Sequence, residues 1–239
     1  MILASGPVIP TFGKGSSCVR GDHTFCWDWV HDHWGDTLQP ALVQHLELTA
    51  IAIVIGFAIA FPLALLAHRF RRLEQPFGAI SALVYTVPSL ALFQLLIPIT
   101  GLTLTTVEIA LVGYTLVMLF PNIVAGLRSA SDDVIEAARG MGLTRAQILV
   151  RIELPLAVPA IIAGLRIAVV STVAIATIAG INVTSKGLGY PIFTALRDPT
   201  PFKTEIYSAG LLAVALAISA DLLLVALRRA VVPWTRAAR

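Results

Sequence analysis

The sequence predicts an all-α membrane protein with about five transmembrane helices, and two observations support this fold class. The first is composition: 57% of the 239 residues are hydrophobic and only 13% are charged, with a mean hydropathy of +0.84. A soluble domain carries about 25% charged residues, and a disordered chain is poor in hydrophobic residues. The second is distribution, because apolar stretches of the roughly 20 residues that cross a bilayer recur along the chain. An ordinary soluble enzyme and a disordered protein are therefore excluded.

Five stretches have the length and composition of a transmembrane helix. Only Arg166 and Asp221 place a charge inside them. A charge within a span is costly, so Arg166 is expected to pair with Asp221, with Glu108 or with a backbone carbonyl. The predicted spans are residues 48–67, 77–99, 109–127, 157–181 and 206–227.

The polar segment before the first span predicts an extracytoplasmic helix lying on the membrane surface. Residues 27–44 are too polar to cross, and their three Trp residues favour the headgroup level. A metal site is one interpretation of His23, His31 and His33 with the nearby Asp residues. Their spacing does not bring them to one helix face, so no metal is expected. Cys18 and Cys26 allow either an external disulfide or two free thiols.

The placement of Lys and Arg predicts the orientation in the membrane. Eleven of the 17 follow the first, third and fifth spans, and five lie on the other side. The positive-inside rule then puts the C-terminus in the cytoplasm and the N-terminus outside. The predicted organisation is an external segment (1–44), a transmembrane domain (45–227) with a cytoplasmic loop (128–155) and an external loop (182–205), and a cytoplasmic tail (228–239).

The cytoplasmic loop 128–155 has the pattern of a helix–turn–helix. Ser131 can cap a first helix, and Gly140 and Gly142 break it. Thr144-x-x-Gln147 forms a capping box for a second helix, and Pro155 is expected to end this helix and to start the next span. A structured loop with balanced charges favours a docking element for another protein. The alternative is a plain connector, although connectors are usually shorter.

The same loop carries a family resemblance. Glu136-Ala137-Ala138-x-x-x-Gly142, followed after nine residues by Ile152-x-Leu154-Pro155, resembles the EAA signature of ABC-importer permease subunits. Within the binding-protein-dependent, methionine-importer-like permeases, the chain resembles the osmoprotectant branch, which takes glycine betaine, choline and carnitine. The segments that carry this second resemblance are His45-Leu46-x-Leu48-Thr49, Val87-Pro88-Ser89-Leu90-Ala91-Leu92, Glu136-Ala137-Ala138-Arg139-Gly140-Met141-Gly142-Leu143-Thr144, Glu153-Leu154-Pro155-Leu156-Ala157, Ala163-Gly164-Leu165-Arg166, Gly187-Leu188-Gly189 and Ala220-Asp221-Leu222. The resemblance also implies a location in a bacterial plasma membrane.

The resemblance implies an energy-coupling role for seven residues of this loop. Glu136 is expected to contact the ATPase, Ala137 and Ala138 to allow close helix approach, and Gly142 to set the turn. Leu154 and Pro155 are expected to transmit force into the fourth span. The full set of expected ATPase-coupling residues is Glu136, Ala137, Ala138, Gly142, Ile152, Leu154 and Pro155.

The implied partners are cytoplasmic ATP-binding subunits, a second permease subunit (identical or not), an extracytoplasmic substrate-binding protein and the bilayer. The sequence has no Gly-x-x-x-x-Gly-Lys-Ser/Thr loop, so ATP and Mg²⁺ are expected on the partner ATPase, and this chain is expected to be neither an enzyme nor a cofactor protein. The small net charge of +3 suggests no nucleic-acid partner. Substrate-binding residues are not identifiable from the pattern.

Two alternatives to the osmoprotectant permease stay open. One is a permease of the same class for another small solute, such as an amino-acid derivative. The other is a stand-alone secondary transporter, which should show internal repeats and coupling ionisable groups in the spans. No clear repeat is visible, and Arg166 is the only deeply placed charge.

Overall fold

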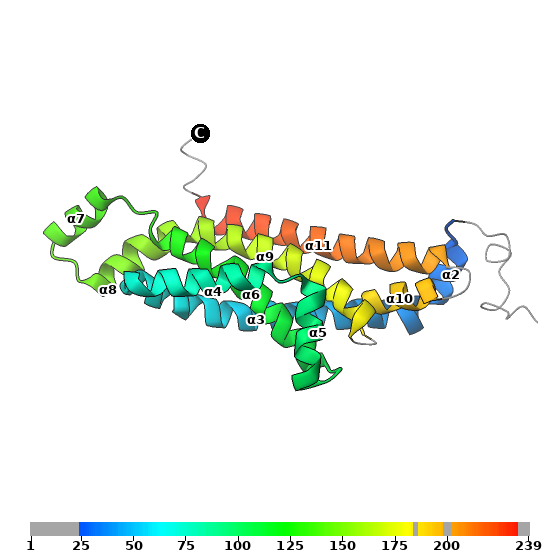
Figure 1. Ribbon diagram of the computed structural model, residues 1–239. Coiled ribbons are helices and arrows are strands. Elements are labelled where there is room, and N and C mark those ends of the chain that lie inside the picture. The colour runs from blue at the N-terminus through cyan, green and yellow to red at the C-terminus, as the bar shows by residue number, and fades with distance from the viewer. Residues whose placement is uncertain (1–23, 184–185, 198–201, 234–239) are drawn as a thin grey trace, which may run out of the picture.

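The computed structural model describes residues 24–183, 186–197 and 202–233, and all regular secondary structure in these ranges is helical. This confirms the all-α prediction. Figure 1 shows a long bundle with α7 and α8 at one end and α2 and α10 at the other. The elements are α2 (Trp27–Asp32), the π-helix η1 (Trp34–Leu38), α3 (Gln39–Arg69), the 3₁₀-helix η2 (Arg71–Leu73), α4 (Glu74–Thr86), α5 (Ser89–Thr100), α6 (Leu104–Leu127), α7 (Asp132–Gly140), α8 (Arg145–Ile148), the π-helix η3 (Leu149–Glu153), α9 (Leu154–Asn182), α10 (Gly189–Arg197) and α11 (Lys203–Val231).

Three helices, α3, α6 and α9, form the centre of the bundle. Small residues lie where they cross: a Cβ on Gly56 of α3 would lie 2.5 Å from Thr115 Cγ2 of α6. Similarly, a Cβ on Gly164 of α9 would lie 2.5 Å from Asn122 Cβ of α6. Helices in lipid associate through such close packing because the surrounding hydrocarbon gives no hydrophobic driving force. The three helices therefore make a tightly packed core against which the other elements lie.

Four of the five predicted spans are confirmed as long apolar helices, and the second requires a correction. The stretch 77–99 is not one straight helix, because α4 and α5 meet at a bend of 99°. The bend falls at Val87-Pro88, where the residue before proline is extended and the helix cannot continue. The Tyr114 hydroxyl of α6 donates to the freed carbonyl of Val87. As a result α5 turns away from the long axis of the bundle (Figure 1).

The polar N-terminal segment is joined to the first span more closely than predicted. A short α2 is followed by η1, which continues directly into α3, so that Trp34–Arg69 forms one apolar helical stretch of 36 residues. Residues 39–44 thus belong to the spanning helix rather than to a separate surface helix. The other part, α2, packs on the start of α11: Cys26 N–H donates to Thr204 Oγ1 at 3.1 Å, and the ring centroids of Trp29 and Phe202 are 5.1 Å apart.

Two further expectations concern this segment. Within the part of the chain that the structure describes, no three His, Cys, Asp or Glu side chains gather as a metal site would require. Cys26 is buried and disulfide-bonded. Cys18 and His23 lie outside the described residues, so the Cys18–Cys26 disulfide stays a prediction.

Arg166, the charge within the fourth span, pairs with Asp221, one of the three partners expected for it. Arg166 of α9 forms an ion pair with Asp221 of α11, and both side chains are about one-third exposed or less. Only 6% of the most apolar window of α11 is buried in the bundle. The ion pair is therefore a main tie between α11 and the core.

The described part of the external loop packs back onto the bundle. Helix α10 contacts both α9 and α11. Its Thr194 hydroxyl donates to the Glu205 carboxylate at the start of α11 at 3.3 Å.

Candidate functional site

Loop 128–155 projects beyond one end of the bundle as two helices and a turn (Figure 1). Gly142 in the turn has a φ of +82°, a conformation that favours glycine. Thr144 Oγ1 accepts from the N–H of Gln147 at 3.3 Å, and Gln147 Oε1 accepts from the N–H of Thr144 at 2.7 Å. The predicted capping box is therefore present. Ser131 occupies the N-cap position of α7, but its side chain makes no capping hydrogen bond.

The second helix of the loop runs without interruption into the fourth span, which corrects the prediction for Pro155. Arg145–Gly180 is one helical stretch of 36 residues, and Pro155 is the second residue of α9 within it. The lost donor of Pro155 is accommodated by η3, in which the Leu154 N–H bonds to the carbonyl of Leu149, five residues back. The loop helix and the fourth span are thus one continuous helical stretch.

Two ion pairs fasten the ends of the loop to the bundle. Arg128, just after α6, pairs with Glu74 at the start of α4. At the other end, His68 Nε2 of α3 lies 3.0 Å from Glu153 Oε2 of η3, and both side chains are largely buried. The positive and negative charges of the loop are equal in number, but Arg128 and Glu153 have their partners outside the loop.

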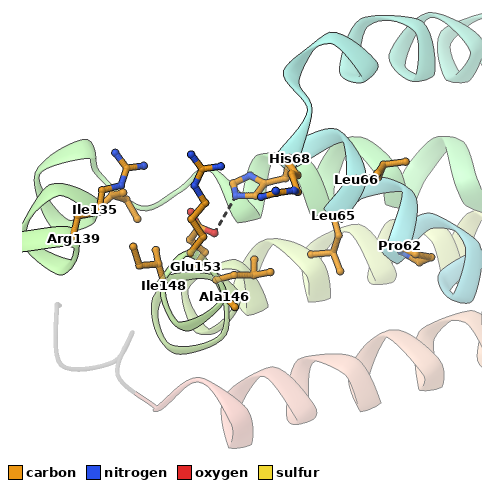
Figure 2. Close-up of a pocket in the computed structure, with 12 residues that line it drawn as sticks. Pro62, Leu65, Leu66, His68, Ile135, Arg139, Ala146, Ile148 and Glu153 are labelled. Carbon is orange, nitrogen blue, oxygen red and sulfur yellow. Dashed lines mark hydrogen bonds and ion pairs between the residues drawn. The ribbon is translucent and has the colours of Figure 1, made fainter. Parts of the chain in front are cut away.

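A cavity of about 580 Å³ separates the loop from the end of α3. Figure 2 shows the His68–Glu153 contact crossing it, with Ile135 and Arg139 of α7 on one side and Leu65 and Leu66 of α3 on the other. Beside this hollow, the loop is attached to α3 through the His68–Glu153 contact and through Leu149 and Leu154, which pack on the apolar cluster that includes α3. The full lining is Pro62, Leu65, Leu66, His68, Arg69, Ile135, Arg139, Arg145, Ala146, Ile148, Leu149 and Glu153.

The outward side of α7 carries an apolar stripe that no described part of the chain covers. Val134, Ala137 and Met141 have the spacing of one helix face, and all three are exposed, Met141 by 73%. The next residue, Ala138, is only 1% exposed and faces the loop interior. An exposed apolar stripe bordered by charged residues such as Glu136 is typical of a surface that binds another protein.

The seven predicted coupling residues therefore divide into two groups. Glu136, Ala137 and Gly142 are exposed on α7 and its turn. Leu154 packs against the cluster of apolar side chains from α3, α6 and α9. The residues that are buried or partly buried, and so connect the loop to the bundle, are Ala138, Ile152, Leu154 and Pro155.

A family assignment follows from residues 52–237, which match the model of the binding-protein-dependent transport system inner membrane component. The chain belongs to this family. The match begins within α3 and includes α6, α9, α11, the bent α4–α5 pair and the whole of loop 128–155. This inner membrane component is thus a multi-pass transport protein.

Individual relatives carry names that describe transported solutes. The chain is 34% identical over 191 residues to the glycine betaine/carnitine/choline transport system permease protein of Bacillus subtilis (strain 168), covering 80% of this chain and 82% of that protein. It is 41% identical over 133 residues to the ergothioneine transport permease/ergothioneine binding protein of Helicobacter pylori (strain G27), covering 56% of this chain and 23% of that protein.

A solved structure shares the fold of this inner membrane component. The match is to the methionine ABC transporter MetNI in an inward-facing conformation, with a TM-score of 0.72 and 22% identity. It covers 81% of this chain and 95% of the other. The expected likeness to a methionine-importer permease is therefore confirmed for the fold.

Sequence reasoning missed the residues that anchor the loop of this inner membrane component. Arg128 and Glu153 were not expected to anchor the loop, and Glu74 and His68 were not singled out. Glu153 and His68 are 85 residues apart in the chain. The available signal for these contacts was weak. Glu153 directly precedes Leu154-Pro155, and His68 lies between the first span and the basic run that follows it.

Proposed function

We propose that this chain is the transmembrane permease subunit of an ATP-driven importer for solutes that carry a trimethylammonium group. The observation that carries the proposal is the exposed apolar stripe of α7, joined through a continuous α8–α9 helix to the core of the bundle. A docking surface outside the bundle and a stiff connection into it are the two parts that a subunit driven by another protein needs.

The solute class rests on the relatives. Glycine betaine, carnitine, choline and ergothioneine are named for two of them, and all four molecules carry a trimethylammonium group. This cation cannot donate a hydrogen bond, so its recognition depends on charge and on aromatic faces. A second candidate within the same class is an amino-acid betaine such as ergothioneine, which the 41% identity to the Helicobacter protein favours.

The proposed partners follow from what the sequence lacks and from the family. ATP and Mg²⁺ are bound by a cytoplasmic ATPase subunit, since this sequence has no phosphate-binding loop. A second permease subunit completes the pathway, and a separate extracytoplasmic protein delivers the solute.

The proposed orientation puts α7 in the cytoplasm and the N-terminus outside. It is supported by the gathering of basic residues at the α7 end of the bundle, where α3 ends in Arg69 and the last turn of α11 holds Arg228 and Arg229.

Coupling then proceeds through named contacts. The ATPase binds Glu136 and Ala137 on the outer face of α7, and Gly142 holds the turn toward α8. Closure of the ATPase subunits pulls α8, and Ile152, Leu154 and Pro155 carry the displacement into α9. The Arg166–Asp221 pair transfers it to α11, and the His68–Glu153 pair transfers it to α3.

The test is uptake into proteoliposomes that hold the chain with its ATPase, with the binding protein supplied outside. Labelled glycine betaine, choline, carnitine and ergothioneine are compared with methionine as the control solute. The proposal predicts ATP-dependent uptake of at least one trimethylammonium solute and none of methionine. Uptake of methionine alone would overturn the proposed solute class.

A further inference from the structure

The two motif segments around His45 and Gly187-Leu188-Gly189 meet at the end of the bundle opposite α7. His45 lies on α3 and is 0% exposed. Its Nε2 lies 3.1 Å from the carbonyl oxygen of Val173 on α9, and its Nδ1 lies 3.3 Å from the backbone N of Leu188. A carbonyl only accepts and an N–H only donates, so a neutral ring with its proton on Nε2 satisfies both partners. One imidazole thus joins α3, α9 and the turn before α10.

The turn itself is part of the α9 side of this junction. A Cβ on Gly189 would lie 1.9 Å from the carbonyl oxygen of Thr177, and a Cβ on Gly180 would lie 2.9 Å from Gly189 Cα. These contacts are between backbones, so the turn packs directly against α9. Since α10 begins at Gly189, the turn, α10 and the outer end of α9 form one unit.

The turn is joined to α3 in a different way. Besides His45, the Gln44 side-chain oxygen accepts from the N–H of Gly187 at 3.3 Å, and Leu188 shares a small apolar cluster with Ala41. This seam consists of long hydrogen bonds and few apolar contacts. Nearer the α7 end, by contrast, Gly56 allows α3 to pack closely on α6.

We propose that His45 is a positioning residue that holds the unit formed by the end of α9, the turn and α10 against α3, and so keeps the outer end of the permease closed. Outward opening separates this unit from α3 and so breaks the bonds of His45 to Leu188 and to Val173. The proposal rests on the proposed function only for the link to transport; the hydrogen bonds themselves are tested separately.

The first measurement is hydrogen exchange of the 186–197 segment in the complete transporter in nanodiscs. His45→Phe keeps a ring of similar size but forms neither hydrogen bond, and the Leu188 amide is expected to exchange about fivefold faster or more, the effect of one lost hydrogen bond. His45→Gln retains a donor and an acceptor and is expected to restore slow exchange. Glu47→Gln, on the exposed side of α3, is the control and is expected to leave exchange unchanged.

The second measurement is solute transported per ATP hydrolysed. His45→Phe is expected to raise ATP hydrolysis in the absence of binding protein and to lower this ratio several-fold, with recovery in His45→Gln. If His45→Phe does not accumulate, Gly187→Ala tests the same junction from the other side, since its Cβ would lie 3.1 Å from His45 Nδ1 at a φ of +73°. Gly187→Ala is expected to raise the exchange of the Leu188 amide in the same way.

Unchanged exchange at Leu188 in His45→Phe, or in Gly187→Ala where that variant replaces it, overturns the proposal. Equal defects in the Phe and Gln variants also overturn it, because they would indicate a purely structural role. Uptake that needs no ATPase would instead contradict the proposed function and leave the exchange result standing.

Discussion

Arg166 of α9 donates two hydrogen bonds to Asp221 of α11, from Nε to Oδ1 at 2.6 Å and from Nη2 to Oδ2 at 2.8 Å. This parallel geometry is the strong form of the arginine–carboxylate pair. The pair is one of the contacts that hold α11 against α9.

Removal of one partner of this pair is predicted to harm the protein more than removal of both. Asp221→Asn leaves Arg166 without a countercharge inside a span, whereas the double variant with Arg166→Gln leaves two neutral side chains. The measurement is thermal stability of the purified protein in detergent. A double variant no more stable than Asp221→Asn would contradict this account of the pair.

Two neighbouring alanines of α7 are predicted to respond differently to enlargement. Ala137→Trp adds a bulky side chain on the exposed face and is expected to abolish ATPase binding while leaving thermal stability unchanged. Ala138→Trp places the same side chain in a buried position and is expected to destabilise the protein by about 1–3 kcal/mol. ATPase co-purification and thermal unfolding of both variants check this contrast; equal ATPase binding by Ala137→Trp and the wild type would remove α7 as the docking face.

The His68–Glu153 pair is predicted to be energetically coupled. Glu153→Gln and His68→Asn each loosen the loop from α3, and the double variant should cost less than the sum of the two. The expected interaction energy is about 0.5–3 kcal/mol, as for side chains in direct contact. Thermal or chemical unfolding supplies the stabilities, and strict additivity would show that the 3.0 Å contact contributes nothing.

Two helical glycines offer a matched pair for core packing. Gly164→Ala places a Cβ 2.5 Å from Asn122 Cβ and is expected to separate α9 from α6, lowering stability and uptake. Gly210→Ala on α11 meets nothing within 4 Å and is expected to be tolerated. The melting temperatures of the two variants are compared directly; similar values would contradict the close α6–α9 approach.

The sequence was most informative where the determining forces are local. The apolar stretches located the spans, and Thr144, Gln147 and Gly142 specified the capping box and turn of the loop, because these depend on residues within a few positions of one another. Hydropathy did not locate the break at Val87-Pro88, because a bent and a straight apolar segment have the same hydropathy. Pro155 was expected to end a helix, but η3 provides the local adjustment that lets the helix continue.

Contacts between distant parts of the chain were not predictable in the same way. His45 and Leu188 are 143 residues apart, and nothing in either segment identifies the other as its partner. The Arg166–Asp221 pair was foreseen as one of three possibilities because charges inside spans are rare and have few available partners. Glu153 and His68 lie outside the predicted spans, where charged residues are common, so the sequence did not identify them as partners.

The central claim is that a partner ATPase drives this permease through α7, and uptake with the ATPase present, absent or catalytically inactive tests it most directly. Proteoliposomes with the active ATPase are expected to accumulate a trimethylammonium solute, and those without it or with the inactive form are expected to show none. Ala137→Trp should match the ATPase-free vesicles. Uptake at the wild-type rate without the ATPase would contradict the account and indicate a transporter that works alone.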